Sequence, residues 1–309
     1  MNIKGKNVLV TGGAGFIGSH LVDRLVADGS EVVVIDNLQA GKMENLESVL
    51  DRITFIKGDI RDVELLKRAI ADVDVVFHIG ANASVPDSVE NPRYDFETNA
   101  LGTFNVLEAS TNSDVKKIVY ASSAAVYGEP EYTPIDEGHP LQPISPYGAS
   151  KLAGEKMGFA FNETYGLDFT AIRIFNTYGP RQPRYVMYDF IKKLRKNPKK
   201  LEVLGTGEQV RDCCYISDMV DAFMLVAEKG DEIYNAAGGI PTSIKELAEF
   251  MVSEISPNAK IRYGGKSWKG DINTLIADIT KLRDLGFKPK VPLEEGVRNL
   301  IRWFEEIHE

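Results

Sequence analysis

The chain has 309 residues, enough for about two domains' worth of hydrophobic core, and its 43% hydrophobic and 26% charged residues are typical of a globular protein. A net charge of −9 argues against a general nucleic-acid binder, and no apolar run approaches the roughly 18 residues of a membrane span. The two cysteines are adjacent and no two histidines have a metal-ligand spacing, so we expect no disulfide framework, no metal site and a reduced, cytoplasmic setting.

The first predicted element is a short buried strand over residues 7–11, followed by a turn rich in glycine. Glycines at 12, 15 and 18 allow a tight turn and a close approach of the backbone to a pyrophosphate. The apolar spacing after the turn predicts a helix, whose N-terminus would add N–H groups and the positive end of its dipole. We therefore predict a dinucleotide site at Gly12, Gly15, Phe16, Ile17 and Gly18.

The second predicted strand, residues 31–35, is followed directly by Asp36 and Asn37. Asp36 lies about 20 residues past the glycines, where a carboxylate can accept hydrogen bonds from the adenosine ribose. Because a carboxylate at this point would repel a 2′-phosphate, the pattern favours NAD over NADP as the cofactor. The alternative is an ordinary turn aspartate at the end of a strand.

The third predicted strand, residues 53–56, leads to a second acidic position. Asp59 and Ile60 follow it, and we predict that they lie at the adenine edge of the cofactor. Asp59 could equally cap a helix that starts near Val63, because aspartate side chains accept N–H bonds at helix N-termini. The sequence leaves both roles open.

Strands and helices continue to alternate along the chain. Residues 73–78 and 117–121 are the fourth and fifth predicted strands, and Ala81 follows the fourth beside the predicted cofactor. A helical segment over residues 93–110 carries Asn99, which would either contact the cofactor or satisfy a buried loop. This alternation predicts an α/β fold with a doubly wound parallel sheet of the Rossmann type.

The fifth strand is followed by groups suited to proton transfer. Ligands of doubly wound sheets bind at the carboxyl ends of the strands, so Ser122 and Ser123 fall near the reactive end of the cofactor. Pro146 suits the first position of a helix, and Tyr147 and Lys151 then lie one turn apart on one face. Free tyrosine titrates near pH 10, roughly, and a neighbouring ammonium pulls that value toward working pH. The alternative is a surface Tyr–Lys pair on an amphipathic helix.

The chain beyond these groups predicts a division into two parts. We assign residues 1–175 to the main part of an NAD-binding domain. Residues 176–309 contain short strand-like runs and capped helices without a long sheet of their own. We expect them to form a smaller C-terminal substrate-binding lobe, with some segments crossing back to the main sheet.

In their order and spacing, these motifs resemble the extended short-chain dehydrogenase/reductase family. Within it the chain is most similar to nucleotide-sugar 4-epimerases of the UDP-galactose (UDP-glucose) 4-epimerase type. The resemblance implies a bound NAD, a UDP-sugar substrate and an isomerase activity. It covers nearly the whole chain and is carried by residues 11–18, 36–37, 58–59, 122–128, 147–151, 176–180 and 211–212.

The resemblance also implies a role for each matching residue. Tyr147 would take the proton of the sugar's O4 as general base while NAD takes the C4 hydride, and Ser123 would hydrogen-bond O4 and relay the proton. Lys151 would bind the nicotinamide ribose and lower the pKa of Tyr147. Asn176 would hold the sugar–diphosphate, and Arg211 would clamp a phosphate as a charge-assisted fork. The predicted substrate-binding set is Ser123, Ala124, Ala125, Tyr147, Asn176, Arg211, Asp271 and Leu275.

Two alanines distinguish the expected 4-epimerase activity from the dehydratase and decarboxylase activities of the family. Dehydratases carry an Asp-Glu pair where this chain has Ala124 and Ala125, and decarboxylases typically carry a Glu in that turn. Without a second acid/base the site can oxidise and reduce C4, so the alanines favour epimerisation. A dehydratase, a decarboxylase, a UDP-glucuronate epimerase and a catalytically silent NAD-binding sensor remain as alternatives.

The chain departs from the family pattern at the diphosphate. The second diphosphate-binding arginine, expected just before residues 270–271, is absent, and Lys266, Lys269, Arg181 and Arg184 are candidates to replace it. How the diphosphate is held is therefore open.

Two further expectations concern the sugar and the assembly. Leu275 stands where epimerases restricted to plain hexoses often carry a bulky tyrosine, so a smaller side chain would leave room for an N-acetyl group; the alternative is a plain core leucine. Homologues commonly pair through a four-helix contact, and here the helices over residues 93–110 and 147–165 would form a homodimer.

Overall fold

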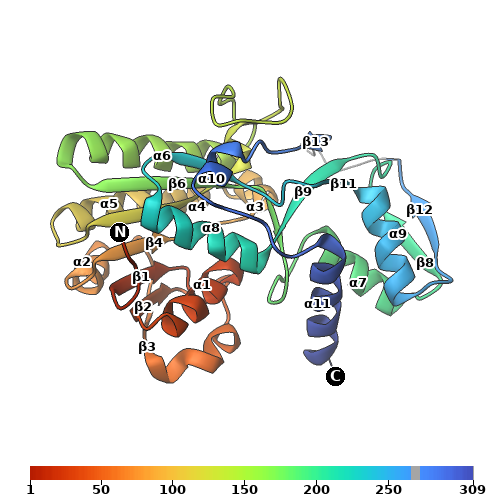
Figure 1. Cartoon of the computed structure of the whole chain (residues 1–309), viewed down its shortest axis with the longest axis horizontal. Coiled ribbons are helices and arrows are strands. Elements are labelled where there is room, and N and C mark those ends of the chain that lie inside the picture. The colour runs from red at the N-terminus through yellow and green to blue at the C-terminus, as the bar shows by residue number, and fades with distance from the viewer. Residues whose placement is uncertain (266–271, 309) are drawn as a thin grey trace.

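The computed structural model describes residues 1–265 and 272–308, and its larger part is a seven-stranded sheet (Figure 1). All neighbouring strands of this sheet are parallel. The order reverses between β1 and β4, so the predicted doubly wound sheet is confirmed and its switch point lies beside the glycine-rich turn. From edge to edge the strands are β10 (Ile233–Ala236), β6 (Asp168–Ile174), β5 (Lys117–Ser123), β4 (Val75–His78), β1 (Asn7–Thr11), β2 (Glu31–Asp36) and β3 (Ile53–Lys57).

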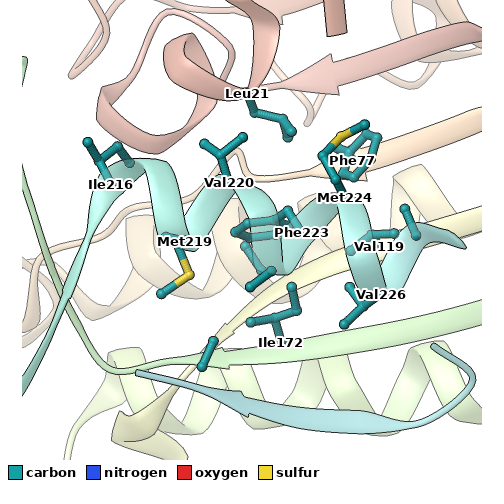
Figure 2. Close-up of a cluster of buried hydrophobic side chains, with 14 of the residues drawn as sticks. Leu21, Phe77, Val119, Ile172, Ile216, Met219, Val220, Phe223, Met224 and Val226 are labelled. Carbon is teal, nitrogen blue, oxygen red and sulfur yellow. The ribbon is translucent and has the colours of Figure 1, made fainter. Parts of the chain in front are cut away.

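Helices cover both faces of this sheet, because alternate strand residues point to opposite sides. In β1, Val8 and Val10 enter one hydrophobic core, while Leu9 enters the other. The first core is closed by α1 (Phe16–Ala27) and α8 (Ile216–Lys229). Figure 2 shows α8 side chains packed beside α1 and strands β4, β5 and β6. The second core is closed by α2 (Val63–Ile70), α5 (Gly102–Thr111) and α6 (Pro146–Tyr165).

The C-terminal half contributes to both parts of the molecule. Strand β10 pairs with β6 and α8 packs on the main sheet, so this stretch lies within the larger part. Around it, a smaller lobe extends to one side in Figure 1. Its strands are β7 (Asn176–Tyr178), β8 (Lys200–Val203), β9 (Val210–Tyr215), β11 (Pro241–Ser243), β12 (Lys260–Tyr263) and β13 (Thr274–Leu275).

The smaller lobe has a hydrophobic core of its own, formed largely by three helices and β8. These helices are α7 (Val186–Lys196), α9 (Ile244–Ile255) and α11 (Leu293–Glu306). The remaining helices and helical turns of the described chain are η1 (Met43–Arg52), α3 (Val85–Glu90), α4 (Pro92–Asp95), η2 (Phe96–Leu101), η3 (Ala124–Val126) and α10 (Thr280–Asp284). None of the helices in this described part combines the length and apolar character needed to cross a membrane.

The helix expected over residues 93–110 consists of three consecutive pieces. Helix α4 passes into the π-helical turn η2, which continues as α5. A π-turn inserts one extra residue per turn and shifts the side chains that follow it. Asn99 lies within this turn and is buried.

Candidate active site

The glycine turn leaves the N-terminus of α1 open to an anion. Gly15 caps α1 without a side-chain hydrogen bond, and the first turn holds no acidic residue. Gly12 has φ +69°, and a Cβ there would lie 2.7 Å from the Cα of Gly80. A Cβ on Gly18 would lie 2.2 Å from the carbonyl oxygen of Gly12. Only glycine fits this packing, which exposes backbone N–H groups and the positive end of the helix dipole as a diphosphate site requires.

Asp36 holds this turn against the end of β2. Its carboxylate accepts the N–H groups of Ala14 at 3.0 Å and Leu38 at 2.8 Å. Burial raises the pKa of Asp36, and the two backbone hydrogen bonds oppose that rise. An ionised carboxylate has about four lone-pair sites, so two remain for ribose hydroxyls.

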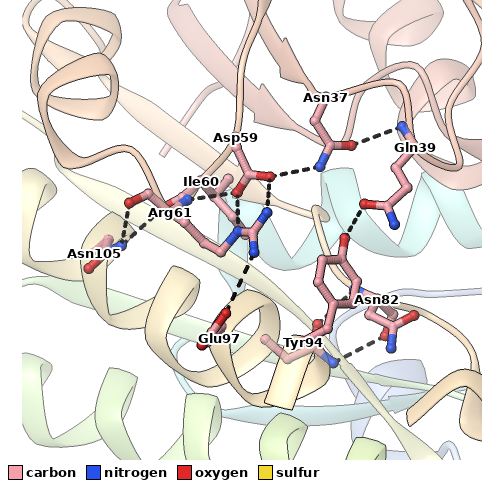
Figure 3. A network of polar contacts seen from close by, with 10 residues as sticks. Asn37, Gln39, Asp59, Ile60, Arg61, Asn82, Tyr94, Glu97 and Asn105 are labelled. Atoms are coloured by element: carbon pink, nitrogen blue, oxygen red, sulfur yellow. Dashed lines mark hydrogen bonds and ion pairs between the residues drawn. The ribbon is translucent and has the colours of Figure 1, made fainter. Parts of the chain in front are cut away.

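The predicted adenine edge is a charged network on the surface of the main sheet (Figure 3). The Asp59 carboxylate accepts two hydrogen bonds from the Arg61 guanidinium, each 2.9 Å long, and one of 2.9 Å from the Asn37 amide. Burial raises the pKa of Asp59, but the hydrogen bonds from Arg61 and Asn37 outweigh it and bring that pKa to about 2. Asp59 is therefore a fixed anion at neutral pH, and with the backbone N–H of Arg61 its four acceptor sites are engaged within the protein.

The alternative role of Asp59 as a helix cap is not observed. Asp62 caps α2 instead, because its side chain accepts the N–H of Leu65 at 3.0 Å. Ile60 is buried between the two aspartates, and its carbonyl accepts the Asn105 amide at 3.2 Å. The contact of Asp59 and Ile60 with a cofactor stays a prediction.

A buried histidine connects the ends of β1 and β4. The Thr11 hydroxyl accepts the N–H of Gly80 at 3.0 Å and lies 2.7 Å from His78 Nδ1. The Thr103 hydroxyl donates to the carbonyl of Asn99 and lies 2.9 Å from His78 Nε2, so Nε2 carries the hydrogen. His78 is thus neutral, and burial, together with the nearby Lys151 charge, lowers its pKa to about 3.

Acid is expected to destabilise the fold through His78. Its pKa is lower in the folded chain than the ordinary 6.5, so between these values the unfolded chain binds more protons and stability falls as pH falls. At pH 5 the loss is about 2 kcal/mol. Urea unfolding at pH 7 and pH 5 should therefore show the stability gap between wild type and H78Q narrowing by about that amount. A stability gap of the same size at both pH values would contradict the assignment.

The predicted catalytic helix begins as its sequence indicates. Ser145 caps α6 by accepting the N–H of Gly148 at 3.1 Å, and Pro146 occupies the first turn. The Ser123 side chain lies close enough to Tyr147 to lower the pKa of its phenol, and the Ser123 hydroxyl accepts the N–H of Ala125 at 3.2 Å. Three predicted elements of the site, namely the end of β5, the η3 turn and the start of α6, are thereby brought together.

Lys151 lies one turn further along α6 and is buried beneath this group. Its ammonium donates to the carbonyl of Ala121 on β5 at 2.8 Å. Burial lowers the pKa of Lys151 to about 8, against the opposing charges of Asp95 and Glu155. We expected Lys151 to lower the pKa of Tyr147, yet burial raises that pKa, and the Ser123 hydrogen bond and the charge of Arg184 are the influences that lower it.

Ser122 points away from its neighbour Ser123 and into the protein interior. Its hydroxyl donates to Glu155, which forms a buried bidentate pair with Arg173 through bonds of 2.9 and 2.8 Å. The Arg173 guanidinium also donates to the Tyr127 hydroxyl at 2.9 Å. Sequence reasoning missed this pair, although Glu155 continues the four-residue spacing of Tyr147 and Lys151. The cofactor contact predicted for Ser122 stays a prediction, and its hydroxyl is engaged elsewhere.

Asn99 performs the alternative role considered for it, since it holds a buried loop. Its amide donates to the Asn82 carbonyl at 3.1 Å, to Asp95 at 3.0 Å and to Ser150 at 3.1 Å, and its oxygen accepts the Asn82 N–H at 2.7 Å. Ala81 lies in the same loop. The cofactor contacts predicted for Asn99 and Ala81 remain untested by this arrangement.

Three of the predicted substrate residues share one small sheet. Asn176 on β7 pairs with Cys213 on β9, and Leu275 on β13 pairs with Arg211 on β9. The Asn176 amide nitrogen is buried and has no hydrogen-bond partner in the described part of the chain, so it can donate to a ligand. Arg211 donates to the carbonyls of Val210 at 2.9 Å and Asn273 at 3.4 Å. Leu275 is half-buried against the main core.

The remaining predicted positions all fall between residues 266 and 271. Asp271 lies outside the described residues, as do Lys266 and Lys269. Within the described residues no group of three or more His, Cys, Asp or Glu side chains could hold a metal ion.

Sequence comparison identifies the family. The profile of the GDP-mannose 4,6-dehydratase family matches residues 9–300. The chain belongs to this family. The resemblance inferred from the motifs is confirmed, and the family includes proteins named both as dehydratases and as epimerases.

Several relatives with high similarity to this chain carry the names of nucleotide-sugar epimerases. A UDP-glucose 4-epimerase of Mycolicibacterium smegmatis is 37% identical, with 96% of this chain and 97% of that protein covered. The solved UDP-N-acetylglucosamine 4-epimerase of Methanobrevibacter ruminantium, in complex with UDP-N-acetylmuramic acid, is 38% identical, with a TM-score of 0.93 and coverage of 98% and 99%. The solved UDP-glucose 4-epimerase of Thermus thermophilus, in complex with NAD, is 37% identical, with a TM-score of 0.88 and coverage of 97% and 99%.

Proposed function

We propose that this protein is an NAD-dependent isomerase that inverts C4 of a UDP-hexose or UDP-N-acetylhexosamine through a transient 4-keto sugar. The observation that carries the proposal is the placement of Tyr147, at the start of α6, beside Ser123 at the carboxyl end of β5, with Lys151 one turn further along α6 and bound to the Ala121 carbonyl of β5. Named relatives across the whole length of the chain support the substrate class.

The residues present suit NAD. The open α1 N-terminus can take the diphosphate, and Asp36 can take ribose hydroxyls. When bound, NAD supplies an acceptor for the C4 hydride and later returns it. The carboxylate of Asp36 also disfavours a 2′-phosphate, as inferred from the sequence.

The chain's own groups handle the proton. Tyr147 would act in its deprotonated form, taking the proton of O4 while the hydride leaves C4 for NAD, and the Ser123 hydroxyl would hold O4 aligned with the phenolate oxygen. Inversion then requires the keto sugar to present its other face before the proton and hydride return. Asn176, with its unpaired amide, would anchor the diphosphate while the sugar turns.

Epimerisation is favoured over dehydration because, within the described part of the chain, the turn beside Ser123 and Tyr147 carries no second free acid. Ala124 and Ala125 occupy the η3 turn next to Ser123. The carboxylates whose charges reach Lys151 are Asp95 and Glu155, and both are held by hydrogen bonds inside the protein. Removal of water from the keto sugar would need a group free to move a proton at C5 or C6.

The test is a substrate panel with purified protein, followed by NMR. UDP-glucose, UDP-N-acetylglucosamine and UDP-glucuronate should each be incubated with the NAD-loaded enzyme. Interconversion at C4 of the plain or acetylated sugar is expected, and Leu275 leads us to expect that the acetylated sugar is accepted. Release of water would assign a dehydratase, release of CO₂ a decarboxylase, and binding of NAD without any turnover a sensor.

We also propose a cytoplasmic homodimer. Its support is the large apolar side chains exposed on the helices expected to pair: Phe96 is 60% exposed, Leu101 42% and Tyr165 60%. Exposed apolar residues on neighbouring helices are typical of an association surface. Light scattering on the eluted protein should give a mass near twice the 34.2 kDa of the chain. The free cysteines Cys213 and Cys214 fit a reducing compartment.

A further inference from the structure

The loop between β7 and α7 reaches from the smaller lobe onto the loop that follows β4. The Arg184 guanidinium donates from Nη2 to the carbonyl of Ala83 at 3.0 Å, and the Tyr185 hydroxyl donates to the same oxygen at 3.0 Å. The guanidinium also lies over the Tyr185 ring, 5.3 Å from its centroid. Two adjacent side chains therefore converge on a single acceptor from the other part of the molecule.

This contact lies beside the catalytic tyrosine. Ala83 directly precedes Ser84, which caps α3, and Ser88 of that helix accepts the backbone N–H of Tyr147 at 3.2 Å. Burial raises the pKa of Tyr147, and the charge of Arg184 is close enough to lower it. Arg184 is thus held, through the Ala83 carbonyl, on the segment that also contacts the start of the Tyr147 helix.

The two arginines that the sequence left as candidates, Arg181 and Arg184, differ in their hydrogen-bond and ion-pair partners. Arg181 is committed, because its Nη1 forms an ion pair with Asp23 at 2.7 Å. Among residues 1–265 and 272–308, Arg184 has no carboxylate partner, and its one hydrogen bond goes to the Ala83 carbonyl. A guanidinium has five N–H donors, so Arg184 can bind an anion without breaking an ion pair.

The position of the loop indicates which anion this is. Arg184 follows β7, where the unpaired amide of Asn176 is buried, and the same small sheet holds Arg211. Both of these residues match diphosphate ligands of the family. A diphosphate that joins a sugar near Tyr147 to this sheet would pass the β7–α7 loop.

We propose that Arg184 is the second cation for the diphosphate of the nucleotide sugar, and that it exchanges the Ala83 carbonyl for a phosphate oxygen when substrate binds. The inference rests on the proposed function for the identity of the ligand. Arg184, in the β7–α7 loop, would then replace the family's arginine that is absent before residues 270–271. Arginine suits this role because its planar fork binds phosphate oxygens in pairs.

The test compares R184Q with the matched control R181Q in the same loop. Titration calorimetry on the NAD-loaded proteins would measure binding of UDP, uridine, UDP-glucose and UDP-glucuronate. R184Q is expected to weaken UDP and UDP-glucose binding by roughly 10- to 100-fold, with uridine binding within about twofold of wild type. R184K should recover part of the loss, and R181Q should bind UDP within about threefold of wild type. Thermal unfolding of each variant checks that the fold is retained.

Three results would overturn the inference. One is wild-type affinity of R184Q for UDP, and another is a wild-type protein that binds neither UDP nor UDP-glucose. A loss confined to UDP-glucuronate would instead assign Arg184 to a carboxylate on the sugar. Because UDP carries no sugar and binds without turnover, a protein that needs Arg184 for UDP but never inverts C4 would refute the epimerase proposal and leave this inference standing.

Discussion

Replacement of Tyr147 by phenylalanine is expected to lower kcat by about 10²- to 10⁴-fold, the usual contribution of a positioned general base. The phenol oxygen is the proposed base, and phenylalanine keeps the ring while removing that oxygen. Binding of NAD should be unchanged within about twofold, because the predicted cofactor contacts at the glycine turn, Asp36 and Asp59 are left intact. Steady-state turnover and fluorescence titration of NAD would measure the two effects separately.

Tyr165 supplies the matched control for this substitution. It lies on the same helix, α6, and is 60% exposed at the other end. Y165F should keep the turnover of the wild type. Equal turnover of Y147F and wild type would remove Tyr147 from the mechanism, and loss of NAD from Y147F would point to a cofactor role in place of proton transfer.

Replacement of Glu155 by glutamine is expected to cost about 3–5 kcal/mol of folding free energy. Glu155 and Arg173 are 0% and 1% exposed at the side chain, so removing one charge leaves the other buried without compensation. The pair joins α6 to β6, and it extends through Ser122 to β5 and through Tyr127 to Asn235 on β10. Urea unfolding followed by circular dichroism would measure the loss.

Glu163, exposed on the same helix, provides the control. E163Q should unfold within about 0.5 kcal/mol of wild type. The double variant E155L/R173L should be less destabilised than the sum of its single variants, because no unpaired buried charge remains. Equal unfolding midpoints for E155Q and E163Q would contradict the assignment of the buried pair as a structural clamp.

Local signals in the sequence predicted the frame of the site well. Ser145 and Pro146 begin α6 as expected, and the glycine turn joins β1 to α1 as expected. Helix caps and turns depend on residues that are only a few positions apart in the chain. Their physical causes can therefore be inferred from the local sequence. Where two local readings competed, as for Asp59, the sequence could not choose, and the structure shows that Asp62 is the cap.

Local reasoning was least informative about side-chain direction. Ser122 and Ser123 are adjacent on β5, yet one donates to Glu155 in the interior and the other meets Tyr147. Successive residues of a strand point to opposite faces, but which face holds the site depends on what packs there. The π-turn that buries Asn99 likewise follows from packing against α6 and has no simple signature in the sequence.

The amino-acid sequence by itself determined the family, the alternating α/β order and the positions of the cofactor turn and the Tyr–Lys helix, because each depends on short spacings along the chain. Only the tertiary structure decided which charges are committed and which are open to a ligand. Arg173 meets Glu155 across 18 residues, Arg181 meets Asp23 across 158, and Arg184 meets Ala83 across 101. An arginine's partner is set by the elements that fold against it, so three arginines that look alike in sequence become a buried clamp, a surface ion pair and the cation proposed to bind substrate.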